Sequence, residues 1–302
     1  MFSPKQITST TEYSKFPYFS TRAELSPAKS LVARRGGERI KTQAAEVAAT
    51  RQETMASMGR VIAAAASNGV TSPLRLVYLA VRARAEVPRM ILEYGKVEYV
   101  DVSVQQQFEA PWGKVKRQNM VPFGQLPVLD VGGGELIAQE AAIARYCATL
   151  VPGLMPSDPI GQAKCDALFH AAEELAETNP LVNALRGEDF ERRKKEFFDK
   201  EFPRRLANFS RIIAASGGPF TRGKSPNYAD FKLYHHLSNA ALLESGCLSP
   251  SPDAGDAMTD FMAAVENLDG IAAYLNRRPQ VVDVGKRPKL EPNVCGSRYL
   301  EG

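Results

Sequence analysis

Hydrophobic residues follow strand and helix periods from residue 74 to residue 151, and their order predicts a small α/β domain. The predicted elements are a strand at 74–79, a helix at 84–94, a strand at 98–102, a strand ending at 131, a strand at 135–138 and a helix at 139–150. A polar stretch separates the second and third strands, and Gly132–Gly134 turns the third strand into the fourth. This order predicts the thioredoxin-like fold.

Beyond a Pro- and Gly-containing linker, apolar residues recur at three- and four-residue spacings, which predicts an all-helical second domain. Pro203 should kink one of its long helices. Asn227 and Asp230 have the spacing of a helix-capping pair. The predicted division is 1–72 an N-terminal extension, 73–151 the α/β domain, 152–280 the helical domain and 281–302 a tail without periodicity.

Composition excludes several protein classes. The 302 residues are 44% hydrophobic, enough for a core, but the longest purely apolar stretch is Val61–Ala66, too short for a membrane span. The four cysteines are far apart and form no Cys-x-x-Cys motif, which argues against a zinc ribbon, a dithiol redox centre and a secreted disulfide scaffold. No metal site, phosphate loop or Ser/His/Asp set is expected.

The positive charge of the chain is confined to its first seventy residues. That segment carries ten Lys/Arg and five Glu, whereas the remaining 232 residues carry 28 basic and 29 acidic residues. The main body therefore lacks the basic excess of a nucleic-acid-binding domain. The segment is also rich in Ser and Thr and has no apolar signal core, which predicts a transit peptide for a mitochondrion or plastid. The alternatives are a retained disordered or docking extension, translation that begins at Met55 or Met58, and a cytoplasmic location.

Several strings along residues 74–280 resemble the cytosolic glutathione S-transferases, and most closely the sigma class, which includes glutathione-dependent prostaglandin D synthases. The strings are Tyr78 at the end of the first strand, Arg82-Ala83-Arg84-Ala85-Glu86, Pro122-Phe123-Gly124-Gln125-Leu126-Pro127-Val128-Leu129, and Gln139 followed by Ala142-Ile143-Ala144-Arg145-Tyr146. The resemblance implies glutathione as co-substrate, a small hydrophobic electrophile as second substrate, and a homodimer. It predicts a transferase, with isomerase or peroxidase activity as further possibilities.

The resemblance assigns the catalytic role to Tyr78, whose hydroxyl would donate a hydrogen bond to the glutathione thiolate. A thiol has a pKa near ~8.5, and lowering it by ~2 units requires about 2.7 kcal/mol of anion stabilisation. The resemblance also implies a cis Leu126–Pro127 bond that exposes the Leu126 backbone to the tripeptide. The glutathione-binding residues implied in this way are Arg84, Trp112, Lys116, Gln125, Leu126, Pro127, Gln139, Glu140 and Glu174.

Glu140 and Glu174 each allow more than one interpretation. Glu140 stands where the family has a serine that binds the γ-glutamyl carboxylate, and a carboxylate facing a carboxylate is repulsive. Glutathione then binds weakly, or Glu140 turns away, or the activity is lost. Glu174, with Glu173, falls where the family has an acidic pair on the dimer-facing helix, although a solvated acidic patch is an equal alternative. His170, His235 and His236 are predicted to be core-edge or surface residues.

Three functions compete at this point. The first is a glutathione transferase, carried by Tyr78, Leu126–Pro127 and Gln139. The second is a catalytically weak or inactive subunit with the same fold, serving structure or assembly in an organelle. It is suggested by Glu140, by the loop from Trp112 to Pro122, which is two residues longer than the usual sigma-class spacing, and by the two extensions. The third, a thioredoxin-type oxidoreductase, is disfavoured because no cysteine lies near the first helix.

Overall fold

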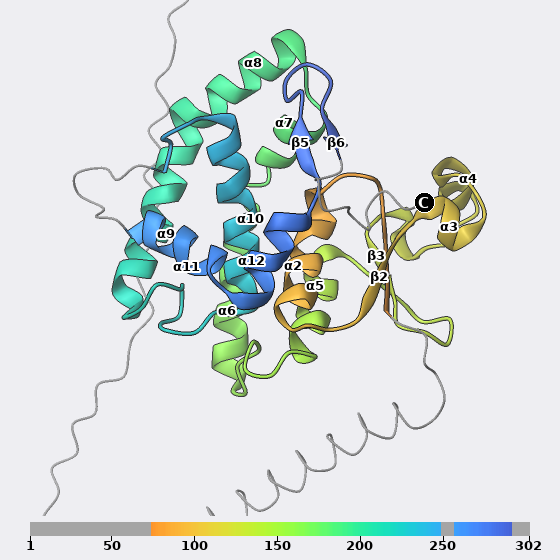
Figure 1. The fold of residues 1–302 in the computed structure, drawn as a ribbon, viewed down its shortest axis with the longest axis horizontal. Coiled ribbons are helices and arrows are strands. Elements are labelled where there is room, and N and C mark those ends of the chain that lie inside the picture. The colour runs from red at the N-terminus through yellow and green to blue at the C-terminus, as the bar shows by residue number, and fades with distance from the viewer. Residues whose placement is uncertain (1–73, 249–256, 292–302) are drawn as a thin grey trace, which may run out of the picture. The chain divides into compact units, whose positions relative to one another are not determined.

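The computed structural model describes residues 74–248 and 257–291, drawn as a coloured ribbon in Figure 1. The predictions made for the N-terminal extension, and for the part of the tail beyond residue 291, lie outside these residues.

A four-stranded mixed sheet forms the centre of the N-terminal half, in the order β2-β1-β3-β4. Strand β1 pairs in parallel with β2 and antiparallel with β3, and β3 pairs antiparallel with β4. The strands are β1 (Leu74–Tyr78), β2 (Tyr99–Ser103), β3 (Val128–Asp130) and β4 (Leu136–Ala138). This topology confirms the thioredoxin-like prediction.

Helices cover both faces of this sheet (Figure 1). On one face, α2 (Glu86–Tyr94) and α5 (Glu140–Thr149) pack on side chains that include Leu76 and Leu129. On the other face lie two short helices, α3 (Val104–Phe108) and α4 (Trp112–Arg117), which bury a separate apolar cluster. The sequence predicts no helix in this region, because most of its side chains are polar.

The second half consists of helices, as predicted. They are α6 (Pro159–Glu173), α7 (Thr178–Asn183), α8 (Gly187–Glu196), α9 (Phe202–Ser216), α10 (Tyr228–Leu243), α11 (Ala257–Glu266) and α12 (Asp269–Arg277). A π-helical turn, η3 (Phe197–Glu201), joins α8 to α9 and ends just before Pro203, where the kink was expected. Asn227 and Asp230 form the predicted reciprocal cap of α10.

Helix α10 is the central element of this half and is buried on nearly all sides. It packs against α6, α7 and α11, and also against α2 and α5 of the other half. His235 and His236 lie on it and are 1% and 0% exposed, so their prediction as core-edge or surface residues was wrong. The error arose because a helix surrounded by other helices has no solvent face, and neighbouring residues on it are all buried.

The tail predicted to lack regular structure includes a short hairpin, β5 (Gln280–Val282) and β6 (Lys289–Glu291). The Gly187 N–H, at the start of α8, donates a hydrogen bond to the Gly285 carbonyl at 2.9 Å. Gly285 has φ = 77°, and a Cβ there would lie 2.6 Å from the Phe190 ring. Glycine therefore allows the hairpin to dock closely on α8.

No helix within residues 74–248 and 257–291 combines the length and the apolar character that a membrane crossing requires.

Candidate functional site

A pocket of about 530 Å³ opens where the ends of β1, β3 and α5 meet α4. Pockets of this size are typical of small-molecule sites. Its lining residues are Tyr78, Leu79, Arg84, Trp112, Lys116, Gly124, Gln125, Leu126, Pro127, Gln139 and Glu140. Nine of the ten residues that the sequence analysis proposed for the site are among them, and only Glu174 lies elsewhere.

Tyr78 is the last residue of β1 and is 8% exposed. Burial raises the pKa of its hydroxyl above the ordinary value, while the backbone N–H of Arg84, which bonds the phenol oxygen, acts to lower it. The hydroxyl therefore keeps its proton at neutral pH and is able to donate a hydrogen bond into the pocket. A donor of this kind stabilises an anion that forms beside it.

The chain before β3 shapes the adjacent wall of the pocket. The Leu126–Pro127 peptide bond is cis, as the resemblance implied. Across the pocket, the Gln139 side-chain amide donates to Gln125 Oε1 at 2.9 Å. Trp112 and Lys116 reach the same pocket from α4, the helix that the sequence analysis did not predict.

Helix α5 begins at this wall. Gln139 precedes it with φ = 73°, and no side chain caps the helix at that position. The first backbone N–H groups of a helix have no partner within the helix, and with the positive end of the helix dipole they favour an anion. The start of α5 thus adds a second anion-stabilising feature to the pocket.

Four charged side chains form what we call the open cluster, because one end of it reaches the pocket: Arg84, Glu140, Glu173 and Lys232. Arg84 lies 3.4 Å from Glu140 and 2.9 Å from Glu173, and Lys232 Nζ lies 2.6 Å from Glu140 and 2.5 Å from Glu173. The side chains of Glu140 and Lys232 are 4% and 0% exposed, whereas Arg84 is 50% exposed. Glu140 thus lines the pocket, but its carboxylate is paired with Lys232 and Arg84, which among the three outcomes expected for this residue is nearest to a side chain that turns away.

The two carboxylates of the open cluster differ in pKa because they differ in burial. Burial raises the pKa of Glu140, although Lys232 and Arg84 act in the opposite direction. Burial acts on Glu173 as well, but there Lys232 and Arg84 prevail and hold the pKa of the carboxyl below its ordinary value. Glu173 was expected only as a member of an acidic pair with Glu174, and Lys232 was not predicted from the sequence at all.

Glu174 lies apart from this pocket. Its carboxylate is 3.5 Å from Arg205 Nε, in a second pocket of about 360 Å³. That pocket is lined by Phe197 and by charged residues of α8, η3, α9 and the segment between α6 and α7. Of the two predicted acidic residues, Glu173 thus reaches the Tyr78 pocket region through Arg84, and Glu174 does not.

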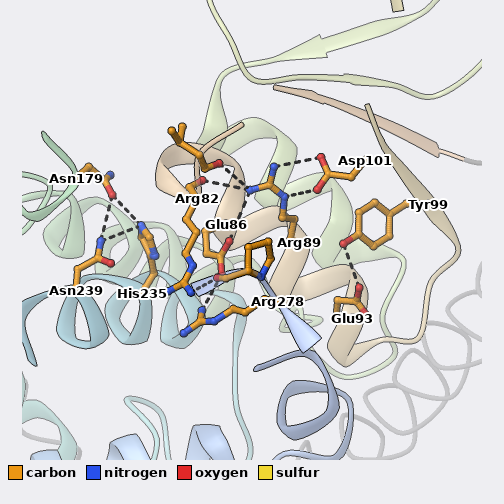
Figure 2. A network of polar contacts seen from close by, with 12 residues as sticks. Arg82, Glu86, Arg89, Glu93, Tyr99, Asp101, Asn179, His235, Asn239 and Arg278 are labelled. Atoms are coloured by element: carbon orange, nitrogen blue, oxygen red, sulfur yellow. Dashed lines mark hydrogen bonds and ion pairs between the residues drawn. The ribbon is translucent and has the colours of Figure 1, made fainter. Parts of the chain in front are cut away.

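A second set of charges, which we call the closed cluster, joins the two halves away from the pocket (Figure 2). It consists of Arg82, Glu86, Arg89, Asp101 and Arg278. Arg89 makes two bonds to Asp101, at 2.5 and 3.1 Å, and Arg278 contacts Glu86 at 2.7 Å. Arg82 donates to the carbonyl of Pro279.

Burial and charge act together in the closed cluster. Burial acts to raise the pKa of Glu86, but Arg278, Arg82 and Arg89 outweigh it and hold the pKa at about 2. His235 lies at the edge of this network, 2.9 Å from Asn179 (Figure 2), and burial lowers its pKa to about 3. These groups keep one protonation state at neutral pH, which suits a structural role.

No group of three or more His, Cys, Asp or Glu side chains in the described part of the chain is arranged to hold a metal ion.

Comparisons with known proteins agree with this geometry. A family model described as the glutathione S-transferase N-terminal domain matches residues 73–149, and one described as the C-terminal domain matches residues 178–278. The chain is 30% identical over 210 residues to hematopoietic prostaglandin D synthase from Gallus gallus, covering 68% of this chain and 96% of that protein. It is 29% identical over 212 residues to glutathione S-transferase 1 from Ascaris suum, covering 68% and 97%.

Among solved structures, the glutathione S-transferase from Ascaris lumbricoides superposes with a TM-score of 0.58 at 27% identity, covering 68% of this chain and 96% of that one. The matched region begins with the sheet that carries Tyr78, and the family models together cover both halves of the fold. The chain therefore belongs to the glutathione S-transferase family.

Proposed function

We propose that the protein is an active glutathione transferase of the sigma class, which conjugates the glutathione thiolate to small hydrophobic electrophiles. The observation that carries the proposal is the meeting of Tyr78, Arg84, the cis Leu126–Pro127 bond and the start of α5 around one pocket. These features supply a thiolate donor, a backbone edge and an anion site in one place.

The chemistry follows from these groups. The Tyr78 hydroxyl donates a hydrogen bond to the thiol sulfur and stabilises its deprotonated form. The Leu126 backbone pairs with the backbone of the tripeptide, as an added strand pairs with a sheet edge. The start of α5, with Gln139, binds the γ-glutamyl carboxylate. The thiolate then forms a bond to the electrophilic carbon, and the leaving group departs with its electron pair.

Glu140 had suggested the alternative of a subunit that has lost activity. That alternative depended on a carboxylate facing the ligand, whereas the Glu140 carboxylate lies against Lys232 and Arg84. The first ground for the alternative is therefore removed, and Trp112 and Lys116 of the lengthened loop still line the pocket. The two extensions lie largely outside the described residues and give no argument against activity, so the transferase is the function we retain.

The test is titration of the full chain with glutathione by calorimetry, followed by a conjugation assay with a generic aryl halide. We expect glutathione to bind with a Kd at or below the millimolar range and the aryl halide to be consumed in a glutathione-dependent reaction. Absence of binding at millimolar glutathione would contradict the proposal.

Two further parts of the proposal concern assembly and address. We propose a homodimer, tested by sedimentation velocity; a single species of monomer mass at micromolar concentration would contradict it.

We also propose that residues 1–72 direct the protein to a mitochondrion or plastid, because this segment is basic, rich in Ser and Thr, and poor in acid. Sequencing the N-terminus of protein purified from its natural source tests this, and an intact Met1 would count against cleavage.

A further inference from the structure

Lys232 is a fully buried lysine held between two carboxylates. Its Nζ lies 2.6 Å from Glu140 Oε1 and 2.5 Å from Glu173 Oε2, and 5.2 Å from the centre of the Phe169 ring. A buried ammonium is unfavourable unless it is paired and hydrogen-bonded, and here it is paired twice. The position of Lys232 on α10 is therefore fixed by its contacts.

Glu140 occupies the position where an anionic ligand would meet the start of α5. It is the first residue of that helix and belongs to the pocket wall, yet its side chain is only 4% exposed. Its two oxygens face Lys232 at 2.6 Å and Arg84 at 3.4 Å. Without these partners, the carboxylate would repel an anion and compete with it for the N–H groups of the helix start.

The charges around Glu140 balance only when Lys232 is included. Arg84 and Lys232 carry two positive charges, and Glu140 and Glu173 carry two negative charges. Tyr78 from β1 also interacts electrostatically with Glu140. His235 and His236 on α10 interact with Lys232 in the same way, but both histidines are neutral because burial lowers their pKa. Removing Lys232 would leave one uncompensated negative charge beside the pocket.

We propose that Lys232 is the positioning residue that makes this pocket able to accept the anionic γ-glutamyl end of glutathione, by holding the Glu140 carboxylate away from the start of α5. The inference rests on the proposed function and deepens it. Lys232 touches no ligand in this role; it acts through Glu140. Where the family has a neutral serine, this chain has the ion pair of Glu140 and Lys232, whose two opposite charges come from different halves of the fold.

The experiment is a double-mutant cycle with Lys232→Met, Glu140→Gln and the double variant. Calorimetry measures the ratio of each variant's glutathione Kd to that of the wild type between about pH 5 and about pH 7.5. The carboxylates of glutathione stay charged over this range, and ionisation of the bound thiol beside Tyr78 is common to all four proteins, so the ratio reports the change around Glu140. We expect Lys232→Met to weaken binding by about 10- to 100-fold at the upper pH. Affinity should recover as the pH falls and Glu140 becomes protonated. The double variant should bind within about threefold of the wild type, with little pH dependence, because Glu173 keeps Arg84.

The matched control is Lys194→Met, which removes a single ion pair with Glu244 (2.9 Å) elsewhere in the helical half and should leave the glutathione Kd unchanged. Folding of each variant is checked by circular dichroism. If Lys232→Met does not fold, Lys232→Gln, which keeps a donor but no charge, takes its place in the cycle.

The inference is overturned if Lys232→Met binds as the wild type does, or if the double variant stays as weak as the single one. Failure of the proposed function gives a different result. If the wild type does not bind glutathione but Glu140→Ser does, then Lys232 fails to neutralise Glu140 while the rest of the site is intact. If neither binds, the proposed function fails, and the inference fails with it.

Discussion

The open and closed clusters join the same two halves of the fold, yet they differ in whether any of their side chains is exposed to solvent. In the closed cluster the side chains of Glu86, Arg89, Asp101 and Arg278 are all at most 11% exposed. In the open cluster Lys232 is fully buried, but Arg84 is half exposed and borders the pocket. A network without an exposed end stabilises the interface between the halves, whereas a network with one exposed end also sets the charge that a ligand meets.

The largest effect is expected from breaking the closed cluster with Arg89→Met. This removes both bonds to Asp101 and the bonds to the carbonyls of Val81 and Arg82. Breaking a buried ion pair from one side leaves an uncompensated charge, so the free energy of unfolding should fall by about 3–5 kcal/mol. Urea unfolding measures it. A loss below about 1 kcal/mol would show that the closed cluster contributes little to the stability of the folded protein.

In the pocket that the open cluster borders, Tyr78→Phe should lower turnover by about 100-fold, which corresponds to about 2.7 kcal/mol. The glutathione Kd should change by less than about threefold. The reason is that the hydroxyl acts on the thiolate and the remaining pocket still binds the tripeptide. Steady-state conjugation of an aryl halide and calorimetric titration separate the two quantities. Turnover equal to that of the wild type would remove Tyr78 from the mechanism.

A third prediction concerns the pH dependence of stability at His235, beside the closed cluster. Burial lowers its pKa to about 3 in the folded protein, against an ordinary value near ~6.5 when unfolded. Between these values the unfolded state binds the extra proton, so the free energy of unfolding falls as the pH decreases, by up to about 1.4 kcal/mol per pH unit.

The conservative variant His235→Gln, whose amide still reaches Asn179, lacks this contribution. Its stability should therefore lie closest to that of the wild type at low pH, because the difference between the two shrinks from about pH 6 to about pH 4. Urea unfolding at several pH values provides the comparison. Parallel stability curves would mean that His235 takes up no proton on unfolding.

The smallest effect is expected from an exposed pair that also links the two halves. Lys96 Nζ lies 2.6 Å from Asp269, but both side chains are more than 70% exposed. Water and salt screen such a pair. Lys96→Met should therefore leave the midpoint of urea unfolding unchanged within error. A clear shift would show that burial does not determine how much the closed cluster, the open cluster and the Lys96–Asp269 pair each contribute to stability.

Much of the fold was predictable because its signals are local. The short apolar run of β1 and the three-residue spacing of Asn227 and Asp230 each lie within one element, and the structure confirms both. Helices α3 and α4 were missed because few of their residues are apolar. A local signal was nevertheless present, since Ser103 and Gln106 form a capping box at the start of α3.

The site likewise contains residues that a local sequence pattern predicts and one residue that it does not. Tyr78, Gln125 to Pro127 and Gln139 stand in short strings whose register could be compared directly. Lys232 could not be found in this way, because it is 92 residues from Glu140 along the chain and α10 has no polar face that would mark it as unusual. Pairing across the two halves is a property of the packed structure, and no spacing in the sequence encodes it.

The hairpin that follows α12 means that the boundary of the family match is not the boundary of the folding unit. The match ends at residue 278, but the carbonyl that accepts a bond from Arg82 belongs to Pro279, and the carbonyl that accepts from the start of α8 belongs to Gly285. A chain cut at the end of the match would leave the buried Arg82 guanidinium without that acceptor, four residues after Tyr78. Pro279, which the family match does not include, is thus part of the support for the segment that follows Tyr78.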